Sequence, residues 1–267
     1  MAILSISREY SSGGEEIGRA VAEELHYEYV NTGRLSQVIQ RAGKKWGDIS
    51  REFDEIPPSF WERFDWEYRG YVTLVEANIL EYAQRNRLVV LGRGSHILLQ
   101  DVPYALKVRI IAPLEKRIER TMDLDRLDRR AALAKIEKTD RDHDNYLKAN
   151  YGQEWNDTRY YDLVLNTGIQ TYEQVVQLLV KALQEADLRT TPEAEQRLRD
   201  QAVTARIKAE LFTDPQIFVP TLEVFHDGSE VVLRGVVHSP KEYHHLEETA
   251  RSFAHGLPIR NELHYRG

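Results

Sequence analysis

The chain has 267 residues, of which 42% are hydrophobic and 30% charged, and its formal net charge is −7. This composition is typical of a folded protein with one large or two ordinary domains. The net charge excludes a general electrostatic attraction to nucleic acid or to an anionic membrane. Because the chain has no cysteine, disulfides and thiolate metal sites are excluded. No apolar run approaches the length of a membrane span and no signal peptide is visible, so a cytoplasmic location is expected.

Five apolar runs predict the strands of a sheet. They are rich in Val, Ile and Leu, and several lack polar alternation, which is typical of strands covered on both faces of a parallel sheet. The runs are Ile3–Ser7, Tyr27–Val30, Leu88–Leu91, Leu106–Ile111 and Leu163–Asn166. Helical patterns lie between them, as in Ile17, Val21 and Leu25, in Leu114–Met122 and in Tyr172–Leu188. The alternation predicts an α/β fold with a parallel five-stranded sheet and helices on both faces.

The composition changes after about residue 186. Residues 189–197 are polar and contain Pro192, which predicts a linker between a domain of residues 1–188 and a second unit of residues 198–267. The second unit shows the patterns Arg197–Phe212 (helix), Leu222–Phe225 and Val231–Val237 (strands), Pro240–Ala254 (helix) and a last strand ending near Tyr265. Fragments that end near Ala186 and begin near Glu195 are expected to fold separately.

Residues 44–72 are rich in Trp and in charged residues, and they predict a helical insertion in the first domain. The aromatic side chains of this region are interpreted as the core of the insertion, in preference to a platform on which a base stacks. They are Trp46, Phe53, Phe60, Trp61, Phe64 and Trp66.

The first strand leads into a Ser- and Gly-rich turn followed by an amphipathic helix, which is the layout of a phosphate-binding loop. Backbone N–H groups and the helix N-terminus favour an anion at such a place. The loop candidates are Ser11, Ser12, Gly13, Gly14, Glu15 and Glu16. The P-loop pattern G-x-x-x-x-G-K-[ST] puts its Lys and its Ser/Thr at Gly14 and Glu15, so both usual side chains are missing. The alternative is a strand-to-helix turn without a ligand.

Two Arg-containing turns follow predicted strands, at the edge of the sheet where ligands bind. Arg93 lies between Gly92 and Gly94, and its planar fork can reach a substrate phosphate; the alternative is a surface salt bridge. The turn at residues 31–34 offers Asn31 and Arg34 to a substrate. Its alternative is a helix cap, with Arg34 paired to a carboxylate.

A basic run at residues 116–142 predicts either a solvated helical face or a lid for phosphoryl transfer. In the lid interpretation, Arg117, Arg120 and Arg141 close over the transferred group and neutralise its charge. The nine His residues show no metal-ligand spacing, so no metal site built from side chains is expected.

Residues 1–185 resemble the cytidylate kinase-like family, a relative of the P-loop nucleoside monophosphate kinases. The matching motifs, in order, are residues 6–14 with Ile17-Gly18, Gly92-Arg93-Gly94, Asp140-Arg141-Asp142-His143 and residues 161–167. The chain departs from the family at Ser11, where a turn Gly is usual, at Glu15, where a basic residue is common, and at His143, where the lid has Arg. Compared with cytidylate kinases, Asn31-Thr32-Gly33 looks like their Asp-Thr-Gly turn and Gly92-Arg93-Gly94 like their Gly-Arg-Asp.

Residues from about 198 to 265 resemble a BON domain, a small α+β module found in bacterial envelope and stress proteins. The matching pieces include Ile207–Leu211, Asp214-Pro215, Asp227-Gly228, Val232–Val237 and Asn261–Leu263. Such modules are thought to bind phospholipid or other ligands, so the resemblance implies possible lipid or protein contacts and a sensing or assembly role.

Together the two resemblances imply an ATP- and Mg²⁺-dependent kinase that phosphorylates CMP, dCMP or a similar phosphorylated acceptor and is regulated or assembled through the BON domain. The loop would hold the β-phosphate, and Arg93 with Arg34 would position the acceptor. One alternative is a pseudokinase that senses a nucleotide or another phosphorylated ligand, and another is a structural partner module. A basic side chain supplied to the loop from elsewhere in the fold would favour the enzyme, whereas an empty, acid-lined loop would favour the alternatives.

Overall fold

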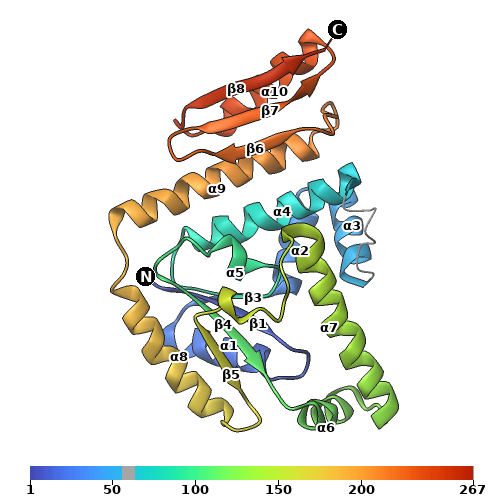
Figure 1. The fold of residues 1–267 in the computed structure, drawn as a ribbon, viewed down its shortest axis with the longest axis vertical. Helices are drawn as coiled ribbons and strands as arrows, with labels where there is room; N and C mark the ends of the chain where they lie inside the picture. Colours follow the sequence, from blue (N-terminus) through green and yellow to red (C-terminus); the bar gives the residue numbers. More distant parts are fainter. Residues whose placement is uncertain (56–63, 267) are drawn as a thin grey trace. The chain divides into compact units, whose positions relative to one another are not determined.

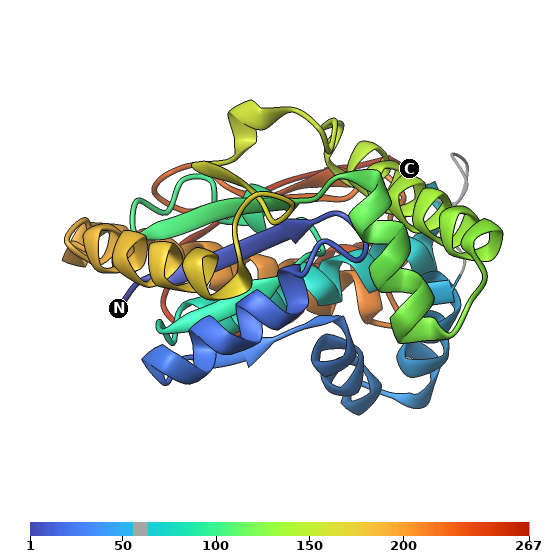
Figure 2. The same cartoon turned by 90° about the horizontal axis from the view of Figure 1, so that it is seen from below.

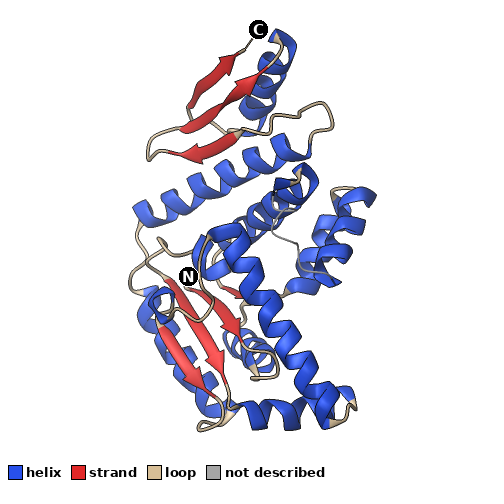
Figure 3. Cartoon of the chain, turned by 45° about the vertical axis from the view of Figure 1, so that its right-hand side comes forward, coloured by secondary structure: helices blue, strands red, loops and turns tan. Residues whose placement is uncertain are grey.

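The computed structural model describes residues 1–55 and 64–266, and for residues 51–55 only the backbone. The strands are β1 (Ile3–Arg8), β2 (Glu28–Val30), β3 (Leu88–Leu91), β4 (Ala105–Ile111), β5 (Leu163–Asn166), β6 (Glu223–His226), β7 (Val231–Val237) and β8 (Ile259–Tyr265). The helices are α1 (Gly14–Leu25), α2 (Thr32–Arg41), α3 (Lys44–Glu55), α4 (Trp66–Ala83), α5 (Ser95–Leu98), α6 (Leu114–Asp125), α7 (Arg129–Tyr151), α8 (Tyr172–Asp187), α9 (Pro192–Thr213) and α10 (Pro240–Phe253), with a 3-10 turn η2 at Thr158–Tyr160 (Figures 1 and 3).

The chain forms two compact units that are interleaved in sequence. Among the described residues, the first unit contains residues 1–34 and 85–191, and the second contains residues 35–55, 64–84 and 192–266. The sequence predicts one break at residues 189–197, but α9 already begins at Pro192. This segment has the features of a helix start, with Pro at the first helical position and the acidic Glu193 and Glu195 in the first turn. Its polar composition led to the prediction of a linker.

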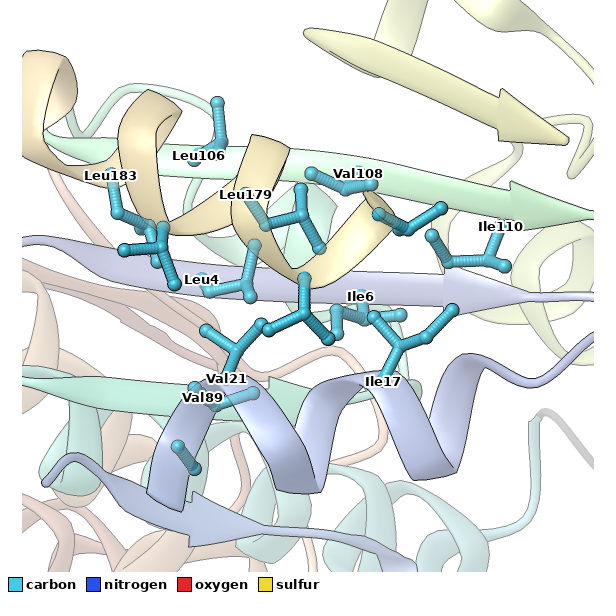
Figure 4. Close-up of a cluster of buried hydrophobic side chains, with 14 of the residues drawn as sticks. Leu4, Ile6, Ile17, Val21, Val89, Leu106, Val108, Ile110, Leu179 and Leu183 are labelled. Carbon is cyan, nitrogen blue, oxygen red and sulfur yellow. The ribbon is translucent and has the colours of Figure 1, made fainter. Parts of the chain in front are cut away.

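The first unit is built on a parallel sheet with the strand order β2-β3-β1-β4-β5. This confirms the predicted five-stranded parallel sheet. On one face, α1 and α8 pack against the strands through a continuous apolar layer (Figure 4). Ile6 of β1, Ile17 of α1 and Leu179 of α8 are fully buried there. On the other face, α5 contacts β1, and the hydroxyls of Ser5 and Ser95 are 2.7 Å apart.

Helices α6 and α7 follow β4 and lie side by side at one end of this unit (Figure 2). Ile118 of α6 packs against Ala132 and Ile136 of α7, and all three are buried. The basic run at 116–142 is therefore two packed helices with a small apolar core between them.

The second unit contains a three-stranded sheet with the order β6-β7-β8, in which β6 and β7 are antiparallel and β7 and β8 parallel. Its core contains residues of α9, α10 and all three strands, among them Ile207, Leu233 and Leu246. The order helix, two strands, helix, strand follows the sequence patterns of the C-terminal residues.

Helix α4 packs along α9 within the second unit. The rings of Trp66 and Phe212 stack with their centroids 4.6 Å apart. A Cβ added to Gly70 would come within 3.1 Å of the Phe212 carbonyl oxygen and 2.7 Å of the Trp46 ring, so the close approach requires glycine. Lys208 of α9 pairs with Glu76 of α4 at 3.1 Å. The helices of the predicted insertion thus share a compact unit with the C-terminal residues.

Of the aromatic residues assigned to the core of the insertion, Trp46 is buried and Trp66 packs on the second unit's core, whereas Phe64 is exposed. Phe53, Phe60 and Trp61 lie outside the residues whose side chains the structure describes. Within residues 1–55 and 64–266, no helix combines the length and apolar content needed to cross a membrane.

Candidate active site

The phosphate-loop candidate joins β1 to α1 at the carboxyl edge of the first unit's sheet. Ser11 and Gly13 both adopt left-handed backbone conformations, with φ of 56° and 88°. Ser11 therefore adopts a left-handed backbone conformation, which favours glycine. The first N–H groups of α1, beginning at Gly14, have no partner within the helix, so they are available to an anion. The Tyr172 ring lies against Gly13, where an added Cβ would meet it at 2.2 Å.

Side chains from α6, α7 and the end of β5 form hydrogen bonds with the backbone of this loop. We call Arg117, Arg120, Asp140 and Thr167 the loop clamp. Arg117 is buried and donates to the Tyr10 carbonyl oxygen at 2.8 Å. Its guanidinium also pairs with Asp140 and, at 3.4 Å, with Glu9. Asp140 in turn accepts a hydrogen bond from the Tyr10 N–H at 2.9 Å.

Arg120 and Thr167 complete the loop clamp. Arg120 donates to the Ser11 carbonyl oxygen at 3.3 Å and to the Thr167 hydroxyl at 3.0 Å. The Thr167 hydroxyl donates to the Ser12 carbonyl oxygen at 2.7 Å. Arg117 and Arg120, which the sequence assigns to the transferred group, thus contact the backbone of the loop in this structure. Their positions suit a role in holding the loop.

The two Ser side chains of the loop are also engaged. The Ser12 hydroxyl lies within hydrogen-bond distance of the carbonyl oxygens of Glu9 and Ile110, at 2.8 and 3.1 Å. The Ser11 hydroxyl lies 2.7 Å from that of Thr121 on α6. Both hydroxyls are thus engaged in contacts within the protein. The groups of the loop that remain for a ligand are its backbone N–H groups.

Arg93 follows β3, the neighbour of β1 in the sheet. Gly92, Arg93 and Gly94 all have positive φ, at 76°, 54° and 73°. Three successive left-handed residues fold the chain tightly and let the backbone approach its surroundings. The Arg93 guanidinium lies over the Tyr146 ring, 5.5 Å from its centroid. Burial lowers the pKa of Arg93, and the facing tyrosines Tyr146 and Tyr151 oppose the shift.

Arg8 is a basic residue of the site that the sequence analysis did not single out. Its side chain leaves the end of β1 beside Gly14, and its Nη1 atom reaches Gly92, where an added Cβ would lie 2.6 Å away. Burial lowers the pKa of Arg8, while Glu15 raises it and Arg93 lowers it further. In the part of the chain that the structure describes, no hydrogen bond or ion pair engages this guanidinium. The sequence feature that could have pointed to Arg8 is its position between the first strand and the loop.

His143 of α7 faces the same cations. Burial lowers its pKa to about 3, and Arg8, Arg93 and Arg109 lower it as well. Its Nδ1 atom is buried and has no hydrogen-bond partner among the described residues. The imidazole is therefore neutral at physiological pH, and the edge of the site carries the two positive charges of Arg8 and Arg93.

The remaining candidates lie as follows. The Asn31 side chain accepts a hydrogen bond from the Arg34 N–H at 3.0 Å, which is the helix-capping alternative, and Arg34 pairs with Glu28. Arg141 is exposed on α7. Glu15 and Glu16 are exposed in the first turn of α1, where Glu15 pairs with Arg19 at 3.3 Å.

Within the described residues, no group of three or more His, Cys, Asp or Glu side chains could hold a metal ion by itself. A Mg²⁺ bound mainly by phosphate oxygens and water needs only one or two carboxylates. The exposed Glu15 carboxylate, at the P-loop position of the usual Ser/Thr ligand, fits that requirement.

A buried polar layer supports the site from the opposite face of the sheet. Arg109 donates to the Trp155 carbonyl oxygen at 2.9 Å, and the His96 ring stacks on Tyr161 with centroids 4.8 Å apart. Burial lowers the pKa of His96 to about 4, and the cations of Arg109 and Lys107 add to the shift. His96 is therefore held in its neutral form by the folded protein.

We expect His96→Phe to reduce the acid sensitivity of the fold. Between pH 6.5 and 4 the unfolded chain protonates His96 and the folded chain does not, so wild type loses stability as the pH falls through this window. Phe keeps the stack on Tyr161 and does not titrate. Its loss of stability from pH 6.5 to 4, measured by urea unfolding, should be smaller by about 1–3 kcal/mol. Parallel stability curves for the two proteins would contradict this assignment.

Comparison with known proteins found a matching family model and several similar proteins. The model of the cytidylate kinase-like family matches residues 3–169. The cytidylate kinase of Aeropyrum pernix is 27% identical over 177 residues, which cover 66% of this chain and 95% of that enzyme. A uronate isomerase of Corynebacterium glutamicum is 42% identical over 95 residues, which cover 35% of this chain but only 18% of that protein.

Among solved structures, an uncharacterized protein from Eubacterium ventriosum has a similar fold. The TM-score is 0.55 at 18% sequence identity, and the match covers 69% of this chain and 99% of the other. At this identity the likeness concerns the fold alone.

Proposed function

Because the chain belongs to the cytidylate kinase-like family, we propose that its first unit transfers the γ-phosphoryl group of ATP to a nucleoside monophosphate such as CMP or dCMP. The observation that carries the proposal is the convergence of Arg93 with the Gly13–Gly14 loop at the ends of neighbouring strands. The Nη1 atom of Arg8 lies beside Gly92, and the charge of Arg93 lowers the pKa of Arg8, so the two loops form one electropositive site. Such a site suits two phosphorylated ligands that face each other.

In this proposal the N–H groups at the start of α1 hold the phosphates of ATP, and Arg93 holds the acceptor phosphate. Arg117 and Arg120 act as positioning residues, because they fix the loop through its carbonyl oxygens. Arg141, exposed on α7, is the lid arginine that remains available to approach the transferred group. Arg34 could help with the acceptor only after releasing Glu28.

The proposed reaction needs no covalent intermediate. An oxygen of the acceptor phosphate attacks the γ-phosphorus, a new P–O bond forms, and the bond from the γ-phosphorus to the β–γ bridging oxygen breaks, which leaves ADP and a nucleoside diphosphate. The acceptor phosphate is largely dianionic at pH 7, so no general base is required. Mg²⁺, when bound, would neutralise part of the negative charge of the phosphates, and Glu15 is the residue that would hold it. The protein contributes positioning and positive charge.

Arg93→Ala tests this assignment. With Mg·ATP and CMP, formation of CDP is followed by phosphorus NMR or by a coupled ADP assay. We expect the KM for CMP to rise by about 10- to 150-fold, since a hydrogen bond to a charged group contributes about 1.5–3 kcal/mol. Arg129→Ala is the matched control, because Arg129 lies on the exposed surface and pairs with Glu115. Equal KM values for the two variants would contradict the role of Arg93.

A second candidate is a sensor that binds a nucleotide without transferring phosphate. The observation in its favour is that Glu15 and Glu16 flank the loop while Arg117 and Arg120 are committed to the loop clamp. Saturable binding of Mg·ATP in a thermal-shift titration, together with no CDP at any CMP concentration, would support the sensor and overturn the kinase.

For residues 198–267 we propose a BON-like module that regulates or assembles the protein. The support is the order α9, β6, β7, α10, β8, together with the sequence resemblance. The outer side chains of this sheet form ion pairs, as Arg234 does with Glu262 at 2.9 Å and Arg260 with Asp227 at 2.8 Å. A polar face of this kind suits protein or small-ligand contact better than insertion among lipid chains.

A further inference from the structure

We propose that Arg8 supplies to the phosphate loop the positive charge that the P-loop Lys supplies elsewhere, through an exchange of residue types between positions 8 and 14. The inference rests on the proposed function. If G-x-x-x-x-G-K-[ST] is laid on the chain so that its Lys falls on Gly14, its first Gly falls on Arg8. The pattern has Gly at the first position and a cation at the seventh, whereas this chain has the cation first and Gly seventh.

The structure gives the exchange a steric basis. A Cβ built on Gly14 would lie 2.6 Å from the Cβ and 2.9 Å from the Cγ of Arg8. Both distances are below any ordinary contact between carbon atoms. The stem of Arg8 thus occupies the space into which a side chain at position 14 would begin to grow. Only one of the two positions can carry a side chain.

The guanidinium of Arg8 is directed along the site. From Gly14 the side chain runs to Gly92, beside Arg93, so it connects the start of α1 with the loop that follows β3. The backbone of Gly92, at a φ of 76° and without a Cβ, leaves room for Nη1. The charge of Arg8 therefore lies between the places proposed for the donor and the acceptor phosphates.

Among the residues that the structure describes, no side chain forms a hydrogen bond or an ion pair with the Arg8 guanidinium. Glu9, the next residue, pairs with Arg117, and Asp140 pairs with Arg117 as well. Asp140 raises the pKa of Arg8, but its ion pair is with Arg117. Glu15 raises the pKa of Arg8 but forms its ion pair with Arg19. A desolvated cation that is unpaired within residues 1–55 and 64–266 is suited to an anionic ligand.

The exchange is tested with Arg8→Met, Gly14→Lys, and the double variant Arg8→Gly with Gly14→Lys. The probe is Mg·ATP in a calorimetric titration, and CDP formation is measured in parallel. Arg8→Met keeps an unbranched stem and removes the charge, so the Kd for Mg·ATP should rise about 10- to 100-fold. Gly14→Lys alone should also weaken binding, because its Cβ collides with the stem of Arg8. The double variant, which places the Gly and the Lys of the P-loop pattern at positions 8 and 14, should bind Mg·ATP within about fivefold of wild type.

Controls keep the outcomes distinguishable. Arg129→Met removes one exposed cation and should leave the Kd unchanged, and a thermal melt without ligand shows whether each variant folds. If Arg8→Met proves unstable, Arg8→Lys takes its place. Arg8→Lys keeps the charge and should therefore retain part of the affinity for Mg·ATP. The inference is overturned if Arg8→Met binds Mg·ATP with the Kd of wild type. It is also overturned if the Kd of the double variant is no lower than that of the weaker-binding single variant. If wild type itself neither binds Mg·ATP nor forms CDP, it is the proposed function that fails.

Discussion

Phe212→Ala is expected to destabilise the protein by about 3–5 kcal/mol, the usual cost of removing a buried aromatic ring. Phe212 is only 1% exposed, stacks on Trp66 of α4, and has the guanidinium of Arg69 4.6 Å from its ring centroid. The substitution therefore opens a cavity between α4 and α9, where the approach at Gly70 leaves little freedom to collapse. Urea unfolding of the full chain measures the loss.

Phe218→Ala is the matched control. Phe218 touches the same Trp66, edge-on at 5.5 Å, but is 64% exposed, so its loss should cost less than about 1 kcal/mol. Equal destabilisation by the two variants would show that the α4–α9 contact is not a core. The same contact bears on fragments: one that begins near Glu195 keeps Phe212 but lacks Trp66, so it should be less stable than the complete second unit.

Arg117→Met is expected to cost about 3–5 kcal/mol, because it removes one partner from a buried charge cluster. The Arg117 side chain is 6% exposed, and those of Glu9 and Asp140 are 22% exposed. Without the guanidinium, two poorly solvated carboxylates face each other behind the loop. The Tyr10 carbonyl oxygen also loses the donor that Arg117 provides. Urea unfolding at neutral pH gives the difference from wild type.

Arg129→Met provides the comparison at an exposed ion pair. Arg129 and Glu115 are 60% and 63% exposed and 2.8 Å apart, and such pairs contribute at most about 1 kcal/mol. If Arg117→Met is as stable as wild type but no longer forms CDP, Arg117 acts on the transferred phosphoryl group, as the sequence suggests. A large loss of stability identifies Arg117 as a member of the loop clamp.

The architecture of the first unit could be predicted because its signals are local. Uninterrupted runs such as Leu88–Leu91 indicate strands buried on both faces, and the spacing of Ile17 and Val21 indicates the buried face of α1. These patterns show which residues are buried. They do not show the partner against which each residue packs, so the packing of α4 on α9 could not be predicted from the sequence.

The site could be predicted in part for the same reason. Gly13 and Arg93 can be proposed as site residues from the sequence, because a turn after a strand has a local signature. Arg117 and Arg120 were identified as cations of the site, but their choice of backbone carbonyls over a ligand depends on tertiary geometry. Arg8 has no such signature, because it stands at the position where the P-loop pattern has Gly and therefore no side chain.

The interleaving of the two units also fixes an order of events during synthesis. Helix α4 is complete once residue 83 is made, but its partner α9 follows only after all of residues 85–191. By then the last strand and α8 of the first unit have been made, so this unit can fold on the ribosome. At that stage Trp66 and its neighbours are not yet packed against α9. Joining α4 to α9 closes a long loop, which is slow. A chain that terminates before Phe212 would keep that apolar surface exposed and would be a substrate for chaperones and proteases.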